Sequence, residues 1–150
     1  ISRTLRMEVA DIPSNLTLLN EYVSEEQLLL LQNSCGIYIH PTEMEGFGHA
    51  TCEAMSTSSV VLTTDAPPMN ELVSNDTGLL IPPLKQTEQH NLGLRHFVSV
   101  SAIETAVDRV LLMSESELSS MGAKARLWYE NNNDNFKANF QAILSRPEMS

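Results

Sequence analysis

The residues best suited to chemistry lie close together between positions 41 and 55. Glu45 stands in a polar stretch that follows a short apolar run, and Gly46 and Gly48 come directly after it. These glycines precede a helical pattern. The first amides of a helix lack intrahelical partners and carry partial positive charge, and glycines let an anion approach them closely. This part of the chain could therefore bind a phosphate without any Lys or Arg.

A second glutamate, Glu53, lies eight residues after Glu45. Ionised carboxylates accept hydrogen bonds and donate none, so pairs of hydroxyl groups are their natural partners. Eight helical residues span about 12 Å at 1.5 Å per residue, which is the scale of a sugar–diphosphate–ribose group. One carboxylate would then bind sugar hydroxyls and the other ribose hydroxyls, with the diphosphate over the helix start.

A purely structural interpretation of the same residues stays open. Residues 46–48 would then form only a tight strand-to-helix turn, Glu45 would be favoured by the helix dipole alone, and Glu53 would face solvent. The two glycines are not a dinucleotide-binding fingerprint, because the third glycine of that motif would fall at Thr51.

Strands and helices alternate around these residues. Short apolar runs predict strands at 16–19, 37–39, 60–63 and 79–81. Apolar periodicity and capping signals, including a capping box formed by Ser24 and Gln27, predict helices at about 24–34, 47–58, 69–73, 101–113, 116–129 and 135–144. Residues 84–98 are polar and are expected to form a loop. Trp128 and Tyr129 are expected to anchor the last helices on the domain.

This alternation predicts an α/β fold with a parallel, Rossmann-like sheet and helices on both faces. The short links between residues 36 and 64 favour a right-handed parallel crossover, and the apolar run at 37–39 suits a strand covered on both faces. Ligands of such sheets bind beyond the carboxyl ends of the strands. The loops at 40–46 and 64–68 occupy that edge.

The charge of the chain is unevenly distributed. The 150 residues carry a formal net charge of −10, and the 78 residues between Arg6 and Lys85 hold 11 acids and no Lys or Arg. This pattern argues against nucleic-acid binding, which needs clustered cations. No apolar run approaches 18 residues, so we expect no transmembrane segment. Cys35 and Cys52 are expected to be buried free thiols.

Residues 36–83 resemble the donor-binding half of retaining GT-B glycosyltransferases, in particular glycosyltransferase family 4. The family's pattern is a strand, a Pro-Ser/Thr loop, Glu-Gly-Phe-Gly and a second Glu after seven intervening residues, which Glu45 and Glu53 match. Further matching segments follow in family order at 60–64, 70–73 and 77–83. The resemblance implies part of the C-terminal domain of a GT-B fold.

The resemblance implies a role for each matched residue. Glu45 matches the catalytic glutamate beside the donor sugar and the reacting centre, and Glu53 matches the glutamate that binds the donor ribose. Gly46, Phe47 and Gly48 match the loop whose backbone meets the donor sugar and phosphates. Transfer with retention of anomeric configuration, without a metal or other cofactor, is what the family implies.

His49 stands where the family usually has an apolar residue. It is a further candidate for a phosphate or sugar contact, and its alternative is an ordinary packed or surface histidine. His40, His90 and His96 show no spacing for a metal site or a catalytic triad.

We expect residues 1–150 to form a single partial domain, with a donor-binding core at 15–83, a loop at 84–98 and a helical tail at 99–145. The family's acceptor-binding N-terminal domain and its Arg/Lys phosphate clamp find no counterpart here. The chain is therefore expected to be a fragment that is inactive or weakly active alone. Its expected partners are a nucleotide-sugar donor, an acceptor of unknown kind and that N-terminal domain, and not a nucleic acid.

Two other functions stay open. The chain could be a non-catalytic module that keeps the sugar-nucleotide pocket, or only the fold, for interaction. It could also belong to a GT-B sugar-nucleotide epimerase. The pair Glu45 and Glu53 favours an enzyme over a module, and the order of the motifs favours a transferase over an epimerase. We expect a cytoplasmic protein, with peripheral membrane association of the full-length protein as an alternative.

Overall fold

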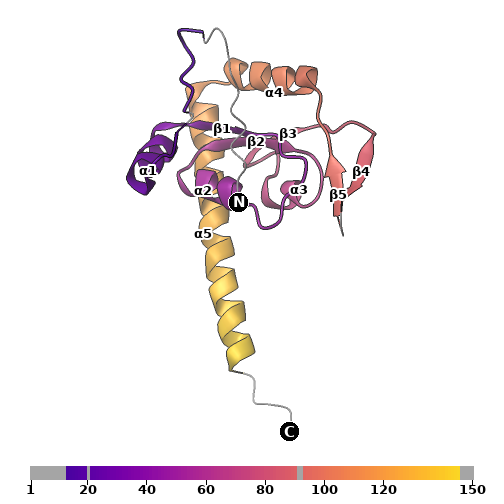
Figure 1. Cartoon of the computed structure of the whole chain (residues 1–150). Helices are drawn as coiled ribbons and strands as arrows, with labels where there is room; N and C mark the ends of the chain where they lie inside the picture. The colour runs from indigo at the N-terminus through magenta and orange to yellow at the C-terminus, as the bar shows by residue number, and fades with distance from the viewer. Residues whose placement is uncertain (1–12, 20, 91–92, 146–150) are drawn as a thin grey trace.

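The structure, a computed structural model, describes residues 13–19, 21–90 and 93–145 (Figure 1). Five helices and five strands are assigned within these ranges. The order is α1 (Glu25–Ser34), β1 (Ile37–His40), α2 (His49–Ser56), β2 (Val60–Thr64), α3 (Met69–Leu72), β3 (Gly78–Ile81), β4 (Thr87–His90), β5 (Gly93–His96), α4 (Val100–Leu112) and α5 (Glu115–Leu144).

A three-stranded parallel sheet in the order β1-β2-β3 forms the centre of the fold. Ile37 pairs with Val60 and Val61 with Gly78, both in parallel, so the expected parallel sheet is confirmed. Every residue of β2 is buried, because the strand has a neighbour on each side and helices on both faces. The α/β class predicted from the alternation is therefore confirmed.

Alternate residues of β2 point into two separate cores, as the period of a strand requires. Val60 and Leu62 pack with residues of α4 on one face of the sheet. Val61 packs with residues of α2 and α5 on the other face, in a cluster with Met55. Figure 1 shows α4 along one side of the sheet and α2 and α3 on the opposite side.

The first part of the domain is less buried than expected. β1 lies at the edge of the sheet, with Ile37 38% and Ile39 47% exposed, so the prediction that both its faces are covered is wrong. The expected strand at 16–19 is not formed either, because no described residue pairs with it. α1 begins after Ser24 with the predicted capping box, yet it buries none of its side chains.

The expected loop at 84–98 contains a two-stranded antiparallel hairpin, in which Thr87 of β4 pairs with His96 of β5. The backbone N–H of Leu84 also donates to the carbonyl oxygen of Phe97 at 2.7 Å, just outside the hairpin. The polar composition led to the wrong prediction. Hairpin pairing satisfies backbone groups and does not need apolar side chains on both strands.

The two helices expected at 116–129 and 135–144 are one continuous helix, α5. The residues between them have low helix propensity, but none is a Gly or Pro that would break the backbone pattern. An i,i+4 ion pair between Arg126 and Glu130, with 2.7 Å between Nε and Oε1, lies where the first expected helix would end. The stacked rings of Phe136 and Phe140 lie further along α5.

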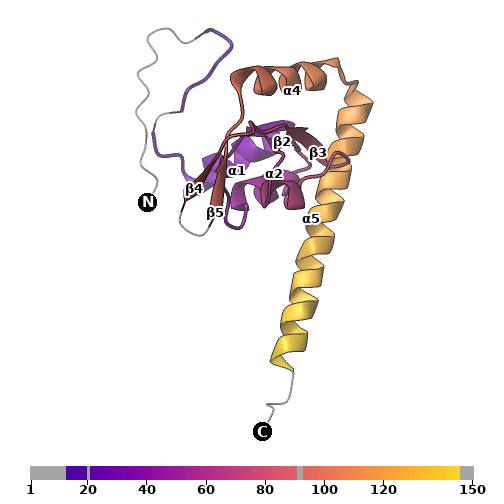
Figure 2. The ribbon, with the colours of Figure 1, turned by 90° about the vertical axis from the view of Figure 1, so that its right-hand side faces the viewer.

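α5 packs on α2 near its start and then runs on beyond the sheet (Figure 2). Gly122 and Ala125 are buried, and the Arg126 guanidinium donates to the carbonyl oxygen of Ser56, the last residue of α2. Trp128 and Tyr129 pack against the core beneath the helix, as predicted. Across the described ranges no helix combines the length and the hydrophobicity needed to cross a membrane.

Candidate functional site

The loop that follows β1 is tied to the carboxyl end of the sheet. The Thr64 hydroxyl, at the end of β2, donates to the carbonyl oxygen of Thr42 at 2.7 Å. The Thr42 hydroxyl donates in turn to the carbonyl oxygen of Met44 at 2.8 Å. These bonds bring the ends of β1 and β2 together, as expected for a ligand edge of a parallel sheet.

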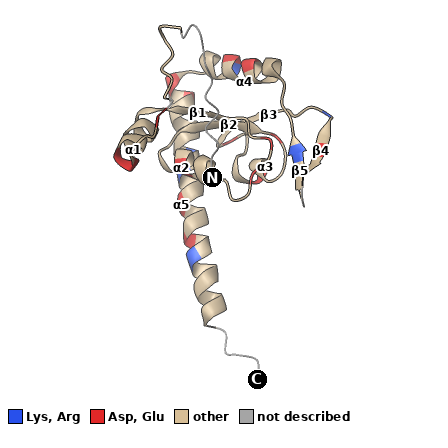
Figure 3. Ribbon diagram, viewed as in Figure 1, with Lys and Arg blue, Asp and Glu red and all other residues tan. Residues whose placement is uncertain are grey.

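The β4–β5 hairpin holds the same loop from another side. Arg95 donates from Nε to Oε2 of Glu43 at 2.9 Å, and a second guanidinium nitrogen contacts the same oxygen. The backbone N–H of His96 donates to the Glu43 carbonyl oxygen at 2.8 Å. Figure 3 shows a blue, basic segment on β5, the strand that contains Arg95. The hairpin thus brings a cation to the stretch that has none of its own.

Arg95 is nevertheless already neutralised. Its guanidinium also lies 3.3 Å from a carboxylate oxygen of Glu88 on β4. The hydrogen bond to Glu43, followed by the charges of Glu43 and Glu88, raises the pKa of Arg95 above its usual value. A ligand phosphate would have to compete with two carboxylates for this cation.

The turn into α2 depends on Gly48. This residue is the N-cap of the helix and has a φ of 79°, a left-handed conformation that suits glycine. A Cβ here would also lie 2.2 Å from a methyl carbon of Leu72 on α3. Because no side chain caps α2, the amides of its first turn are left for another partner.

Glu45 precedes this turn and is half-buried. Its Oε1 accepts a hydrogen bond from the backbone N–H of Gly46 at 3.0 Å. Phe47 follows and is 64% exposed. Its ring lies 4.7 Å from the ring of His49, measured between centroids.

α2 begins at His49, later than expected, so Glu53 is its fifth residue, and this side chain is exposed. Its Oε2 accepts a hydrogen bond from the side-chain amide of Gln32 on α1 at 2.8 Å. Gln32 was not identified as a site residue from the sequence. Nothing local in the sequence signals this contact, since the two residues are 21 positions apart.

Glu45 and Glu53 act on the same two neighbours. The pKa of Tyr38 is raised chiefly by burial, and next by the negative charges of Glu53 and Glu45. The pKa of the Cys52 thiol is also raised chiefly by burial, and next by the charges of Glu45 and Glu53. The charges of the two carboxylates therefore reach the same two side chains, one on β1 and one on α2. Cys52 is buried as predicted, whereas the prediction that Cys35 is buried is wrong.

A cavity of about 650 Å³ opens between the start of α2 and the second half of α5. The α2 side brings together Phe47, His49 and Glu53 with Cys52. Glu45, Gly46 and Gly48 do not line it. The volume lies within the range of small-molecule sites. The α5 side is formed by Tyr129, Asn132, Asn133, Asn135, Phe136 and Asn139, none of which was predicted as a site residue.

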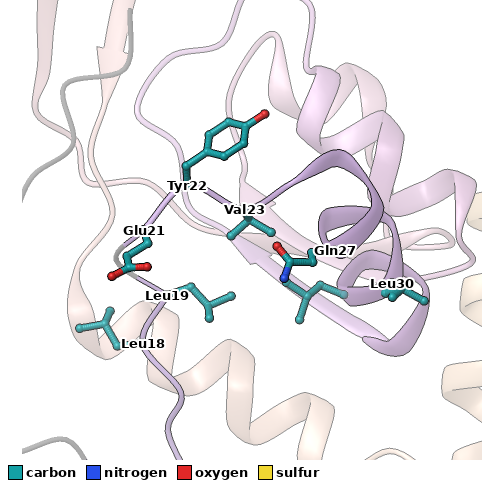
Figure 4. A pocket seen from close by; sticks show the side chains of 8 residues that line it. Leu18, Leu19, Glu21, Tyr22, Val23, Gln27 and Leu30 are labelled. Carbon is teal, nitrogen blue, oxygen red and sulfur yellow. The ribbon is translucent and has the colours of Figure 1, made fainter.

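Another cavity of about 650 Å³ lies between α1 and the segment before it (Figure 4). Leu18, Leu19 and Leu30 give it mainly apolar walls, with Glu21 and Gln27 among its polar lining residues. None of the candidate site residues lines it, so it offers no place for the predicted chemistry.

His40 ends β1, and its buried Nδ1 has no hydrogen-bond partner among the residues that the structure describes. Its ring lies 5.7 Å from that of Tyr38. Within the ranges that the structure describes, no group of three His, Cys, Asp or Glu side chains is placed to hold a metal ion.

Comparison with known protein families gives one match for the chain. The model described as "Glycosyl transferases group 1" matches residues 7–128, which include every candidate site residue predicted from the sequence and the start of α5. No curated protein matches the chain.

Proposed function

Because the chain belongs to the group 1 glycosyl transferases, we propose that it supplies donor-site glutamates for retaining sugar transfer. Transfer from a nucleotide-sugar donor is the activity of this family. In our proposal, Glu45 acts beside the donor sugar and the reacting centre, and Glu53 binds the donor ribose. The donor-binding core comprises residues 15–83, and residues 99–145 form a helical tail against it.

The observation that carries this proposal is the placement of the two carboxylates around one helix start. Glu45 lies before the Gly48 turn and Glu53 lies just over one turn into α2, and both charges act on Tyr38 and Cys52. The uncapped first turn of α2 lies between them in the chain. Hydroxyl acceptors on each side of unpaired amides suit a sugar–diphosphate–ribose group.

Residues 46–49 contribute to the same proposed site. The backbone of Gly46, Phe47 and Gly48 would meet the donor sugar and phosphates, and His49 would add a contact from the first turn of α2. A carboxylate held near an oxocarbenium-like centre stabilises its positive charge, which is the role proposed for Glu45. The Gly46 N–H donates to this carboxylate at 3.0 Å, so that amide is engaged by Glu45 while no donor is bound.

The test compares Glu53→Gln and Glu45→Gln in the full-length protein, with Glu104→Gln on the opposite face of the sheet as the control. Glu53→Gln should weaken donor binding by about 10- to 100-fold, the cost of losing hydrogen bonds to a charged group. Glu45→Gln should lower turnover by about 100-fold with a smaller effect on donor affinity. Calorimetry gives the affinities, and NMR of the product gives its anomeric configuration.

Unchanged kinetics in both variants would overturn the assignment of the two glutamates. Product of inverted configuration would overturn retention and leave the binding role of Glu53 standing. Donor binding without any transfer would favour the non-catalytic module.

A further inference from the structure

Glu45 has few contacts of its own that could fix its position. Among the described residues, the hydrogen bond that its carboxylate accepts comes from the backbone N–H of Gly46, the next residue in the chain. This bond moves with the loop and ties the carboxylate to nothing outside it. The position of the Glu45 carboxylate therefore depends on what holds the backbone just before it.

The β4–β5 hairpin binds the residue two positions earlier, Glu43. The carboxylate of Glu43 accepts hydrogen bonds from two guanidinium nitrogens of Arg95, and the Nε of Arg95 lies 2.9 Å from Oε2. The backbone carbonyl oxygen of Glu43 accepts a further hydrogen bond, at 2.8 Å, from the N–H of His96. The hairpin thus holds both the side chain and the main chain of this loop residue.

The hairpin also contacts the residue between Glu43 and Glu45. A Cβ at Gly93 would lie 2.9 Å from the terminal methyl carbon of Met44, so the Met44 side chain lies close to the backbone of β5. The Met44 carbonyl oxygen accepts a hydrogen bond from the Thr42 hydroxyl at 2.8 Å. Both residues that directly precede Glu45 are therefore in contact with the hairpin.

Arg95 is itself held within the hairpin. It is the cross-strand partner of Glu88 on β4, and its Nη1 lies 3.3 Å from a carboxylate oxygen of that residue. Its guanidinium carbon lies 5.4 Å from the centre of the Phe97 ring. The backbone bond from Leu84 to Phe97, at 2.7 Å, joins this end of the hairpin to the segment after β3. The Arg95 side chain therefore links a held hairpin to the loop.

The hairpin has no evident use in the core of the domain. Its two strands form a separate sheet beside the three-stranded one (Figure 1). Every residue of β4 is exposed, and no residue of either strand belongs to the two core clusters. The contacts of β5 with the loop before Glu45 indicate instead that the hairpin serves the proposed site.

We propose that the β4–β5 hairpin positions Glu45 for the sugar-transfer step, with Arg95 as the positioning residue. This inference rests on the proposed function, in which Glu45 acts beside the reacting centre. Arg95 does not touch the donor in this proposal, because it acts through Glu43 and the loop backbone. The stabilisation that a carboxylate gives to a developing positive charge depends on its placement, so a displaced loop should slow the reaction.

The experiment measures donor hydrolysis, the transfer of the sugar to water, by the full-length protein, because this reaction needs no added acceptor. UDP-glucose, GDP-mannose and ADP-glucose are the probes, and all variants are compared on the one that the unaltered protein hydrolyses fastest. Arg95→Gln, Arg95→Lys and Glu43→Gln alter the contact between hairpin and loop. Lys85→Gln is the control for loss of one positive charge beside the hairpin, and Glu88→Gln is the control for loss of the other partner of Arg95.

We expect Arg95→Gln to lower kcat by about 10-fold, short of the roughly 100-fold that a misplacement of about 1 Å can cost. The donor KM should change by less than about twofold, because the loss arises in the transition state and the donor-binding groups of α2 stay in place. Arg95→Lys keeps the charge but loses the planar pair of donors, so it should recover only part of the turnover. Glu43→Gln should lower kcat in the same direction, and both controls should behave like the unaltered protein.

A second background tests whether Arg95 acts through Glu45. In Glu45→Gln protein the carboxylate is already absent, so adding Arg95→Gln should lower kcat no further. A merely structural role of Arg95 would lower kcat by the same factor in both backgrounds. Melting temperatures show which variants are folded, and Arg95→Lys replaces Arg95→Gln in this comparison if the latter does not fold.

The results separate the failure of this inference from that of the proposed function. If Glu45→Gln lowers turnover while Arg95→Gln and Glu43→Gln keep the kcat of the Lys85→Gln control, only the inference about the hairpin is overturned. An equal loss from Arg95→Gln in both backgrounds overturns it as well. If Glu45→Gln leaves turnover unchanged, or the unaltered protein hydrolyses none of the three donors, the proposed role of Glu45 is overturned together with this inference.

Discussion

Gly122 is the position where one methyl group should disturb the arrangement of α5 and α2. A Cβ at Gly122 would lie 2.1 Å from the carbonyl oxygen of Ser58. That oxygen has little freedom to retreat. Backbone hydrogen bonds from Ser58 to Met55 and from Ser59 to Ala54, both 3.1 Å, hold the turn, and Ser58 itself has a φ of 61°.

Two effects of Gly122→Ala oppose each other. Alanine stabilises a helix interior by about 1 kcal/mol relative to glycine. Forcing extra volume into a packed contact costs about 1–3 kcal/mol, and the upper part of that range applies because the neighbour is backbone. The clash should therefore win by about 1–2 kcal/mol. For a chain of this length that lowers the melting temperature by about 2–8 °C.

Thermal and urea unfolding, followed by circular dichroism, measure this effect. Ser119→Ala is the control, because Ser119 is exposed on α5 and gains only helix propensity. Its melting temperature should stay the same or rise slightly. If Gly122→Ala were as stable as the unaltered protein, or more so, the close approach of α5 to the end of α2 would be refuted. The alignment of α5 with α2 in opposite directions would then lose its support.

Three other outcomes follow from the contacts of Cys52 and Arg95. Iodoacetamide should modify the exposed Cys35 well before the buried Cys52, as followed by peptide mass spectrometry. Burial and the neighbouring carboxylates raise the pKa of Cys52 above 9.0, so the folded state favours its protonated thiol. The stability that the protonated thiol provides is complete below about pH 9 and is lost as pH rises through the pKa of the folded state. In urea titrations over that pH range, the free energy of unfolding should therefore fall less for Cys52→Ala than for the unaltered protein. Arg95→Gln should speed amide hydrogen exchange around Glu43, whereas Lys85→Gln should not; equal rates in both would show that the hairpin does not hold the loop.

Elements fixed by neighbouring residues were predictable from the sequence. The α1 start at Ser24 needs only Gln27 three residues later, and the capping box forms as predicted. β2 was predictable from the apolar residues that begin it, and all of Val60–Thr64 is buried. In each case the deciding interactions are local or depend on hydrophobicity alone, so a sequence pattern contains most of the necessary information.

The β4–β5 hairpin was missed because its deciding contacts join distant parts of the chain. Arg95 and Glu43 are 52 residues apart, and neither the pairing nor the ion pair leaves a local pattern. The expected break in α5 falls on residues of low helix propensity, yet the helix is continuous. Packing of Gly122 and Ala125 on α2 and the core anchors the helix before the asparagine-rich stretch begins.

The sequence predicted one side of the candidate site, and the fold adds the other. The candidates lie close together between Glu45 and Glu53 and carry a family pattern, so they could be found without coordinates. The asparagines of α5 lie more than 70 residues further along and belong to no motif. Only the path of α5 along α2 makes them lining residues of the same cavity.

The acidic composition of the chain raises the question of which groups would bind an anionic donor. The one cation that the described structure ties to the loop before Glu45 is Arg95, and Glu43 and Glu88 already neutralise it. The cavity beside Glu53 has no Lys or Arg in its lining. Charge attraction from these side chains therefore contributes little to the binding of the diphosphate. Among the described residues, the helix-start amides and the hydroxyl-binding carboxylates are therefore the groups that remain for the proposed donor site.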